Sequence, residues 1–322
     1  MKQCSYIATP LLLAALFSSI GALAQVYPAK PVRVVVPWPP GASNDAVARI
    51  VFQKMAEMLK EQFVIENRGG ASGTIGADGV AKSTPDGYTI MVHSATHIAN
   101  AHLYKKLPYD TLNDFIGITT LARQVYMLVA HPSLPVASVK EFIALARKRP
   151  GEVTYASAGS GSGTHLPMSL LGSMTGIAVN HVPYKGGGPA VIAMVSGETQ
   201  AGFAVVSDIY RHIAAKRVRL LAVASAERLK QFPDVPAIAE TVPGYEFTAW
   251  VGAFAPPKTP GPIIDKLNAD LRKALDDPDV ASKLEAQALY AMHMTPEQFS
   301  QRLRSDHDKY GKLIREIGAT ID

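Results

Sequence analysis

A regular alternation of short strand-forming runs with amphipathic helical patterns constrains the fold of this chain most strongly. The run 33–37 is rich in valine, and apolar residues follow it over 46–59 at the spacing of a helix. The pattern recurs along the chain, with strands expected at 63–66, 89–93, 126–130, 153–157, 178–182, 201–206 and 220–225, and helices at 138–149, 164–175, 188–196 and 208–215. Strands that alternate with helices of this length build parallel sheets from β-α-β units, so we expect an α/β fold.

The last quarter of the chain departs from this alternation. After a strand expected at 250–255, a proline-rich segment leads into helices expected at 263–275, 280–286 and 296–317. Thr295 is a favourable N-cap before Pro296, and Gln298 stands where a capping box requires a glutamine.

Residues 1–24 have the pattern of a cleaved signal peptide. Lys2 supplies the positive charge, residues 11–17 form an apolar run, and residues 22–24 read Ala-Leu-Ala. A membrane anchor would need about 20 continuous apolar residues, and serines and a glycine interrupt this run. We therefore expect cleavage of this leader and localisation in the periplasm.

Composition limits what the exported chain can be. The only cysteine, Cys4, leaves with the leader, so no disulfide can stabilise the mature protein. A hydrophobic content of 48% with 18% charged residues indicates a compact globular protein. The formal charge is only +5, and the densest basic patches, 147–149 and 216–219, lie where helices are expected to end. The charge pattern therefore gives no indication of a nucleic-acid partner.

Three segments share one design, in which a strand ends in a loop of small and hydroxyl residues and a helix begins at once. They are 37–45, 93–98 and 157–165. In an open α/β sheet, ligands bind at the carboxyl ends of strands, and a helix N-terminus there offers unpaired N–H donors to an anion. Ordinary helix capping explains any one such loop equally well. Three together favour a binding cleft for a group such as a carboxylate.

Four further side chains lie near strand ends or helix starts, and each keeps two interpretations. Lys185 could face a ligand or a surface carboxylate, and Asp208 could cap its own helix or pair with an ammonium group of a solute. His97 and His165, near helix N-termini, could donate to a ligand carboxylate; the other interpretation is a metal ligand for His97 and a partner of a catalytic serine for His165.

Signals for catalysis are weaker. No serine has glycine both two positions before and two positions after it, so the nucleophile elbow of hydrolases is absent. The run 159–163 does not complete the dinucleotide motif G-x-G-x-x-G, because Thr164 takes the place of the last glycine. His93, His97 and His102 are spaced like metal ligands, but no H-E-x-x-H motif accompanies them. We expect no catalytic residue, no metal and no cofactor.

These segments, in this order, resemble the Bug-type solute receptors, the extracytoplasmic receptors of tripartite tricarboxylate transporters. The matching segments are VPWPPG at 36–41 with Asp45, ENRGGASG at 66–73, PDGYT at 85–89, HVPYKG at 181–186, PDVP at 233–236, and Trp250 with the Ala-Pro pair at 255–256. The match covers essentially the whole mature chain. Ala42 stands where the family usually has a second glycine, and Gly69-Gly70 stands where it often has Pro-Gly.

The resemblance implies a periplasmic binding protein type II-like fold, with two α/β domains joined by two crossing strands and the ligand cleft between them. We expect one domain at 26–124 plus 248–322 and the other at 125–247. In this family the loop after the first strand grips a ligand carboxylate, partly through ordered water, and the loop 160–165 would supply the other half of the grip. The candidate ligand-binding residues are Trp38, Pro39, Pro40, Gly41, Ser43, Asp45, Ser94, Thr96, His97, Ser160, Gly161, Ser162, Thr164, His165, Lys185 and Asp208.

The expected function is that of a periplasmic receptor for a small carboxylate, such as a di- or tricarboxylate, an aromatic acid or an acidic amino acid. Its partner would be the two-component membrane permease of a tripartite transporter, and a monomer is the default state. Two alternatives stay open at this point. One is a periplasmic serine hydrolase or transferase that uses Ser160 or Ser162 with His165, and the other is a sensory domain for a signalling partner.

Overall fold

The computed structural model describes residues 27–318, so the predicted signal peptide at 1–24 lies outside the described residues. The strands are β1 (Val32–Val36), β2 (Phe63–Asn67), β3 (Thr89–Ser94), β4 (Ile116–Ala130), β5 (Thr154–Ser157), β6 (Asn180–Pro183), β7 (Ala201–Val205), β8 (Arg219–Val223), β9 (Thr248–Ala255) and β10 (Leu289–Ala291). The α-helices are α1 (Ser43–Leu59), α2 (Thr74–Ala81), α3 (Thr96–Leu103), α4 (Val139–Lys148), α5 (Leu166–Thr175), α6 (Gly187–Ser196), α7 (Val206–Ala214), α8 (Gly261–Leu275), α9 (Pro278–Glu285) and α10 (Pro296–Ile317).

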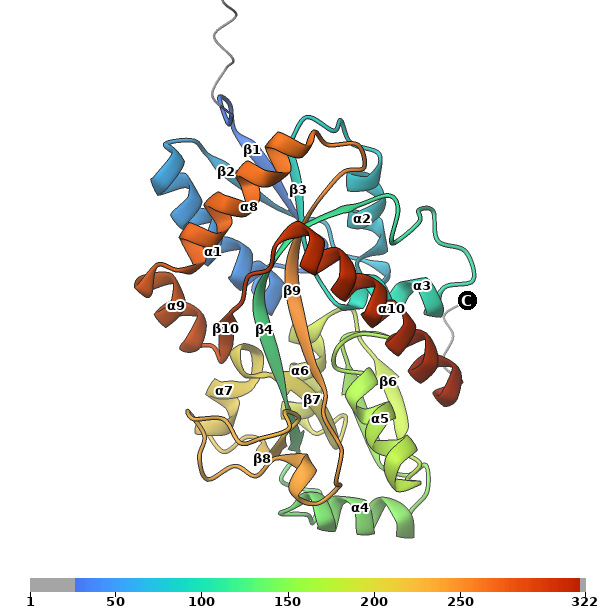
Figure 1. The fold of residues 1–322 in the computed structure, drawn as a ribbon. Helices are drawn as coiled ribbons and strands as arrows, with labels where there is room; N and C mark the ends of the chain where they lie inside the picture. Colours follow the sequence, from blue (N-terminus) through green and yellow to red (C-terminus); the bar gives the residue numbers. More distant parts are fainter. Residues whose placement is uncertain (1–26, 319–322) are drawn as a thin grey trace, which may run out of the picture.

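The strands form one strongly bent sheet in the order β2-β1-β3-β9-β4-β7-β5-β6. β1 pairs in parallel with β2 and β3, and β5 pairs in parallel with β6 and β7. The long strand β4 joins the two groups, because residues 116–125 pair with β9 whereas residues 126–130 pair with β7 and β8. The result is two α/β lobes, with β4 and β9 running between them (Figure 1).

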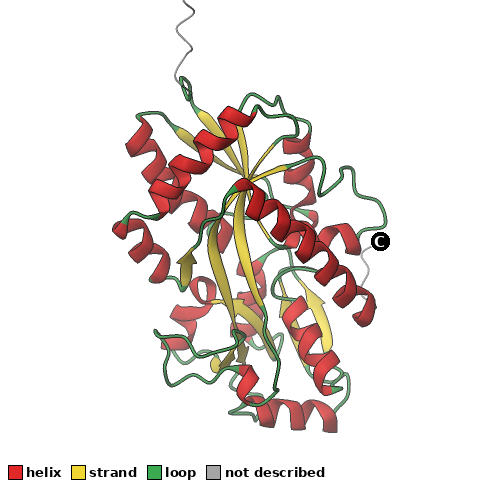
Figure 2. Cartoon of the chain, viewed as in Figure 1, coloured by secondary structure: helices red, strands yellow, loops and turns green. Residues whose placement is uncertain are grey.

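We call the part built on β1, β2 and β3 the first lobe and the part built on β5 to β8 the second lobe. Helices cover both faces of the sheet in each lobe (Figure 2). In the first lobe the apolar stripe of α1, with Val47, Val51 and Met55, shares one buried cluster with three of the four valines of β1 and with Leu267 of α8. Burial of such side chains is the main source of stability in a chain without disulfides.

Helix α10 connects the lobes on one side. It packs against α3 of the first lobe, against β4 and against α5 of the second lobe. Its Asp306 accepts hydrogen bonds at Oδ2 from the indole nitrogen of Trp250, on β9, at 2.7 Å and from Arg302 at 2.8 Å. This buried carboxylate is thus paired with a cation, as a buried charge must be.

The expected fold class is confirmed, and the expected strands and helices match observed ones to within a few residues with one exception. The exception is β4, which begins ten residues before the expected strand at 126–130. Its first part is buried on both faces and contains Gly117, Thr119 and Thr120, so it lacks the alternation that marks a strand. α2 and β10 were not expected. The change of partners within β4 lies at 125/126, one residue after the expected domain boundary at 124/125, and the domain limits themselves stay a prediction.

Candidate functional site

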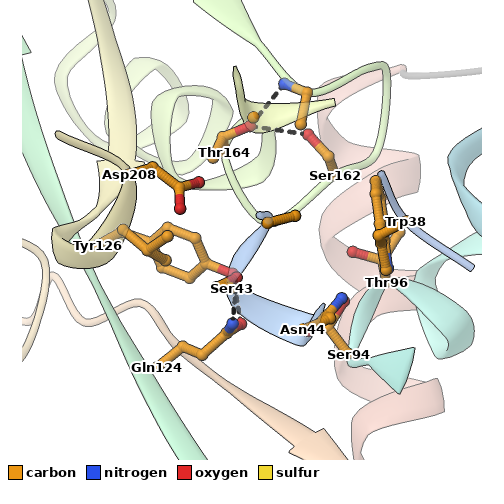
Figure 3. A pocket seen from close by; sticks show the side chains of 15 residues that line it. Trp38, Ser43, Asn44, Ser94, Thr96, Gln124, Tyr126, Ser162, Thr164 and Asp208 are labelled. Atoms are coloured by element: carbon orange, nitrogen blue, oxygen red, sulfur yellow. Dashed lines mark hydrogen bonds between the residues drawn. The ribbon is translucent and has the colours of Figure 1, made fainter. Parts of the chain in front are cut away.

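A cavity lies where the two lobes meet, and its lining comes from both of them. It holds about 400 Å³ of space between atoms, part of which is open to solvent. The first lobe contributes Trp38, Ala42, Ser43, Asn44, Ser94 and Thr96, β4 contributes Gln124 and Tyr126, and the second lobe contributes Ala158, Ser162, Gly163, Thr164, Gly187, Val205 and Asp208. Figure 3 shows the polar side chains of these elements directed toward one common space.

The helices that start at this cavity share a feature at their N-termini. α1, α3, α6 and α7 have first-turn residues in the cavity lining, and all four begin without a hydrogen bond from a capping side chain. Of the helices whose first turns do not line the cavity, α4, α9 and α10 are capped by Ser138, Asp277 and Thr295, whereas α2, α5 and α8 have no such cap. An uncapped helix start presents free N–H groups and the positive end of the helix dipole. Four such starts around one cavity make it a favourable environment for an anion.

A short chain of hydrogen bonds crosses the cavity floor between α1 and β4. The Tyr126 hydroxyl donates to the Gln124 side-chain oxygen at 3.3 Å, and the Gln124 amide donates to the Ser43 hydroxyl at 2.7 Å. Burial raises the pKa of the Tyr126 phenol, which therefore stays neutral. The side-chain oxygen of Asn44 is buried with no partner among the described residues, so it can accept from a ligand or a water.

Asp208 is the acidic group of the cavity. The Ser207 hydroxyl donates to its Oδ1 at 3.0 Å. Burial raises the pKa of Asp208 to about 6, only partly offset by that hydrogen bond. Asp208 lies in the first turn of α7 and lines the cavity (Figure 3).

The loop between β1 and α1 is held in place by Asp45. This buried carboxylate accepts hydrogen bonds from the Gly41 amide at 2.9 Å, from Arg49 at 2.9 Å and from Asn67 at 3.0 Å. Burial tends to raise the pKa of Asp45, but these hydrogen bonds outweigh it and the net pKa is lowered. The Asp45 side chain faces the loop and does not line the cavity. Its hydrogen bonds fix the position of neighbouring residues that do line the cavity.

We expect Asp45→Ala to lower the free energy of unfolding by about 2–4 kcal/mol, because it removes a paired buried charge and leaves the Gly41 amide without an acceptor. Asp279→Ala is the matched control. Like Asp45, Asp279 lies in the first turn of a helix and pairs with a basic residue four positions further on, but this pair lies at the surface. Such exposed pairs are worth less than about 1 kcal/mol. Equal losses in urea unfolding of the two variants would contradict the role given to Asp45.

His97 is fully buried and does not line the cavity. Its ring lies among the rings of His93, Tyr109, Phe115 and Phe254, with centroids 4.6–5.8 Å away. Burial lowers the pKa of His97 to about 3, so the ring is neutral. His93 lies between His97 and the cavity, and its Nδ1 accepts from the Trp38 indole nitrogen at 3.4 Å.

The glycine-serine loop before α5 contributes unequally to the cavity. Ser162 and Thr164 line it and their hydroxyls are 3.0 Å apart, whereas Ser160, Gly161 and His165 do not. The Ser160 carbonyl instead accepts from Ser72 of the first lobe at 3.2 Å, which joins the lobes at one edge of the cleft.

The His165 ring makes its hydrogen bonds to groups other than Ser160 and Ser162. Its Nδ1 accepts from the Gly161 amide at 3.0 Å, and its Nε2 lies 3.5 Å from the Ser169 hydroxyl. Burial, and then the neighbouring His181, lower the pKa of His165 to about 3. Neither Ser160 nor Ser162 is hydrogen-bonded to this ring, so the nucleophile and base of the hydrolase alternative are not brought together.

The predicted site residues thus fall into three groups. Those that line the central cavity are Trp38, Ser43, Ser94, Thr96, Ser162, Thr164 and Asp208. Those that line two adjoining hollows are Pro39, Pro40, Gly41 and the exposed Lys185. Those that line neither are Asp45, His97, Ser160, Gly161 and His165. Sequence reasoning missed Ala42, Asn44, Gln124, Tyr126, Ala158, Gly163, Gly187 and Val205.

Two features are absent from residues 27–318. No group of three or more histidine, cysteine, aspartate or glutamate side chains there could hold a metal ion. No helix in the same range has the length and apolarity needed to cross a membrane.

Two α/β lobes joined by two strands, with a polar cavity between them, define a solute-binding protein of the periplasmic binding protein type II-like class. Residues 47–319 match the model of the tripartite tricarboxylate transporter family receptor, and the chain belongs to this family. The predicted resemblance is therefore confirmed. The family and its structural neighbours are solute-binding receptors rather than enzymes.

Two relatives match nearly the full length. The UPF0065 protein of the tcbD–tcbE intergenic region of Pseudomonas sp. strain P51 is 37% identical over 292 residues, which are 90% of this chain and 87% of that protein. BugT of Bordetella pertussis is 35% identical over 303 residues, which are 92% of each chain.

Solved structures agree with this placement. Rpa4515 of R. palustris, solved with adipate, has a TM-score of 0.88 at 32% identity and covers 92% of this chain and 100% of its own. The periplasmic binding protein BugD has a TM-score of 0.86 at 30% identity over 91% and 99% of the two chains. MatC of Rhodopseudomonas palustris, solved with bound malate, has a TM-score of 0.83 at 31% identity over 89% and 100%.

Proposed function

We propose that this chain is an exported periplasmic receptor that binds a small carboxylate between its lobes and delivers it to the two-component membrane permease of a tripartite transporter. The observation that carries the proposal is the set of four uncapped helix N-termini around the central cavity. Adipate in Rpa4515 and malate in MatC support a carboxylate as the ligand. The receptor acts as a monomer whose domains are 26–124 plus 248–322 and 125–247.

The physical argument concerns the cost of burying a charge. A carboxylate that leaves water must find a hydrogen bond for nearly every lone pair, and each hydrogen bond to a charged group is worth about 1.5–3 kcal/mol. The N–H groups at the starts of α1 and α6 and the hydroxyls of Ser162 and Thr164 can supply these bonds from opposite lobes. Binding therefore favours the closed arrangement of the lobes.

A thermal-unfolding screen of residues 25–322, refolded from urea to remove bound solutes, tests the proposal. A carboxylate at about 1,000 times its dissociation constant should add about 4 kcal/mol of stability. At about 2–4 °C per kcal/mol this is a shift of roughly 8–16 °C in Tm. The matching amides should give no shift. A folded, ligand-free protein whose Tm no carboxylate raises would overturn the proposal and reopen the sensory alternative, which a pull-down of a signalling protein instead of a permease would support.

A further inference from the structure

The charge balance of the central cavity limits the chemistry of its ligand. Of the fifteen residues that line it, Asp208 is the only one with an ionisable acidic or basic side chain apart from the neutral phenol of Tyr126. No lysine, arginine or histidine is among them. Arg211 and Lys185 line the adjoining hollows instead. A dicarboxylate in this cavity would place its second negative charge beside Asp208 without a side-chain cation to balance it.

Asp208 is also placed to accept a hydrogen bond from something not supplied by the chain. Ser207 satisfies Oδ1, but the described part of the chain places no hydrogen-bond donor on Oδ2. Arg211, three residues further along α7, donates to His212 rather than to Asp208. The carboxylate thus keeps one oxygen free at the cavity wall, where a ligand can reach it.

The neighbouring helix leaves room for this carboxylate. A Cβ added to Gly187, the first residue of α6, would lie 2.6 Å from Oδ2 of Asp208. Any side chain at this position would push Asp208 out of its place. The absence of a side chain at 187 and the free Oδ2 together form a small acceptor subsite beside the helix N-termini.

We propose, on the basis of the carboxylate-binding function above, that the ligand is an amino carboxylate whose ammonium group binds Asp208 while its carboxylate binds the helix N-termini. The ligand then brings both charges that the cavity lacks, one cation for Asp208 and one anion for the positive helix ends. Burial raises the pKa of Asp208 to about 6, so at neutral pH the group is mostly ionised but poorly solvated, and a cation relieves that cost.

Pairs of ligands that differ at one end test this subsite. We would measure by calorimetry the dissociation constants of β-alanine against succinate, 4-aminobutyrate against glutarate, and 5-aminopentanoate against adipate, together with α-amino acids and their deaminated acids. The wild type should bind the amino member of at least one pair tenfold or more tighter than its partner without the amine. Asp208→Asn should weaken that amino compound by tenfold or more and should bind the matching diacid as well as or better than the wild type does.

Two outcomes separate this inference from the function on which it rests. If the wild type prefers diacids, or if Asp208→Asn weakens amino acids and diacids equally, the ammonium subsite is wrong and the carboxylate receptor stands. If no carboxylate of either kind binds, the receptor proposal fails and the subsite fails with it. The melting temperature of ligand-free Asp208→Asn serves as the folding control, and it should not fall, because a buried amide costs less than a buried carboxylate.

Discussion

Gly163→Ala is expected to reduce affinity for the carboxylate ligand by 100-fold or more, which corresponds to about 2.7 kcal/mol. A Cβ at position 163 would lie 2.0 Å from the Tyr126 hydroxyl and 2.7 Å from the ring carbon that carries it. The ring cannot turn away freely, because it is 4% exposed and packs against Phe247 with a centroid distance of 5.7 Å. The added methyl group must therefore push β4 and the loop before α5 apart, and both of these elements line the cavity.

The same substitution elsewhere provides the control. Gly261 starts α8, has no atom within 4 Å of an added Cβ, and is far from the cavity lining. Gly261→Ala should leave affinity unchanged. Adding Tyr126→Phe to Gly163→Ala removes the shortest contact and should restore part of the lost affinity. Calorimetric titration of the best carboxylate from the screen measures all three variants, and a Gly163→Ala protein that binds like the wild type would show that the cavity is not the ligand site.

Gly163 also illustrates which parts of the site the sequence could reveal. The loop that contains it is visible as a strand end rich in glycine and serine before a helix, and local chemistry is enough to mark it. The reason for a glycine at 163 is the hydroxyl of Tyr126, 37 positions away and on another element. Only the packing of β4 against the second lobe brings the two together.

The wall formed by β4 was missed for the same reason. Gln124 and Tyr126 lie in a strand among mostly apolar residues, and no turn or helix start beside them marks them as functional. Their role depends on a hydrogen bond from Gln124 to Ser43 across 81 positions. A lone glutamine in a buried strand was the one available signal, since buried polar side chains need a partner.

Asp45 and Asp208 show a property that the local sequence does not predict, namely whether a side chain faces the cavity. Both are acids in the first turn of a helix that follows a strand, so the sequence treats them alike. Asp45 is directed inward by Arg49 and Asn67, whereas Asp208 meets only Ser207 and lines the cavity. Local pattern locates the loops of such a fold, but the direction of each side chain depends on its bonding partners, and some of these, such as Asn67 for Asp45, lie outside the local segment.

Buried histidines should make the stability of this protein strongly dependent on pH. His93 and His97 are fully buried, and His165 is 7% exposed. Burial is the main cause that lowers the pKa of each ring, to about 3 for His97 and His165 and well below the usual value for His93. In the unfolded chain the same rings take up protons near pH 6.5. Because the folded pKa values are depressed, the stability is fully present above pH 6.5 and is lost as the pH falls below it.

We therefore expect the free energy of unfolding to fall by about 4 kcal/mol per pH unit below pH 6, since each of the three rings contributes about 1.4 kcal/mol. His181, whose pKa burial lowers to about 4, adds to this fall. Between pH 7 and pH 5 the three rings together remove about 6 kcal/mol, and protonation of Asp208, whose pKa is raised, returns about 1 kcal/mol. The net loss of about 5 kcal/mol is comparable with the whole stability of many domains, so unfolding near pH 5 is expected. Urea unfolding at pH 8, 7, 6 and 5 measures the slope. His97→Phe should reduce the slope by about one proton, and His293→Gln, at an exposed ring, should leave it unchanged. A flat profile between pH 7 and 5 would contradict the neutral, buried state of these rings.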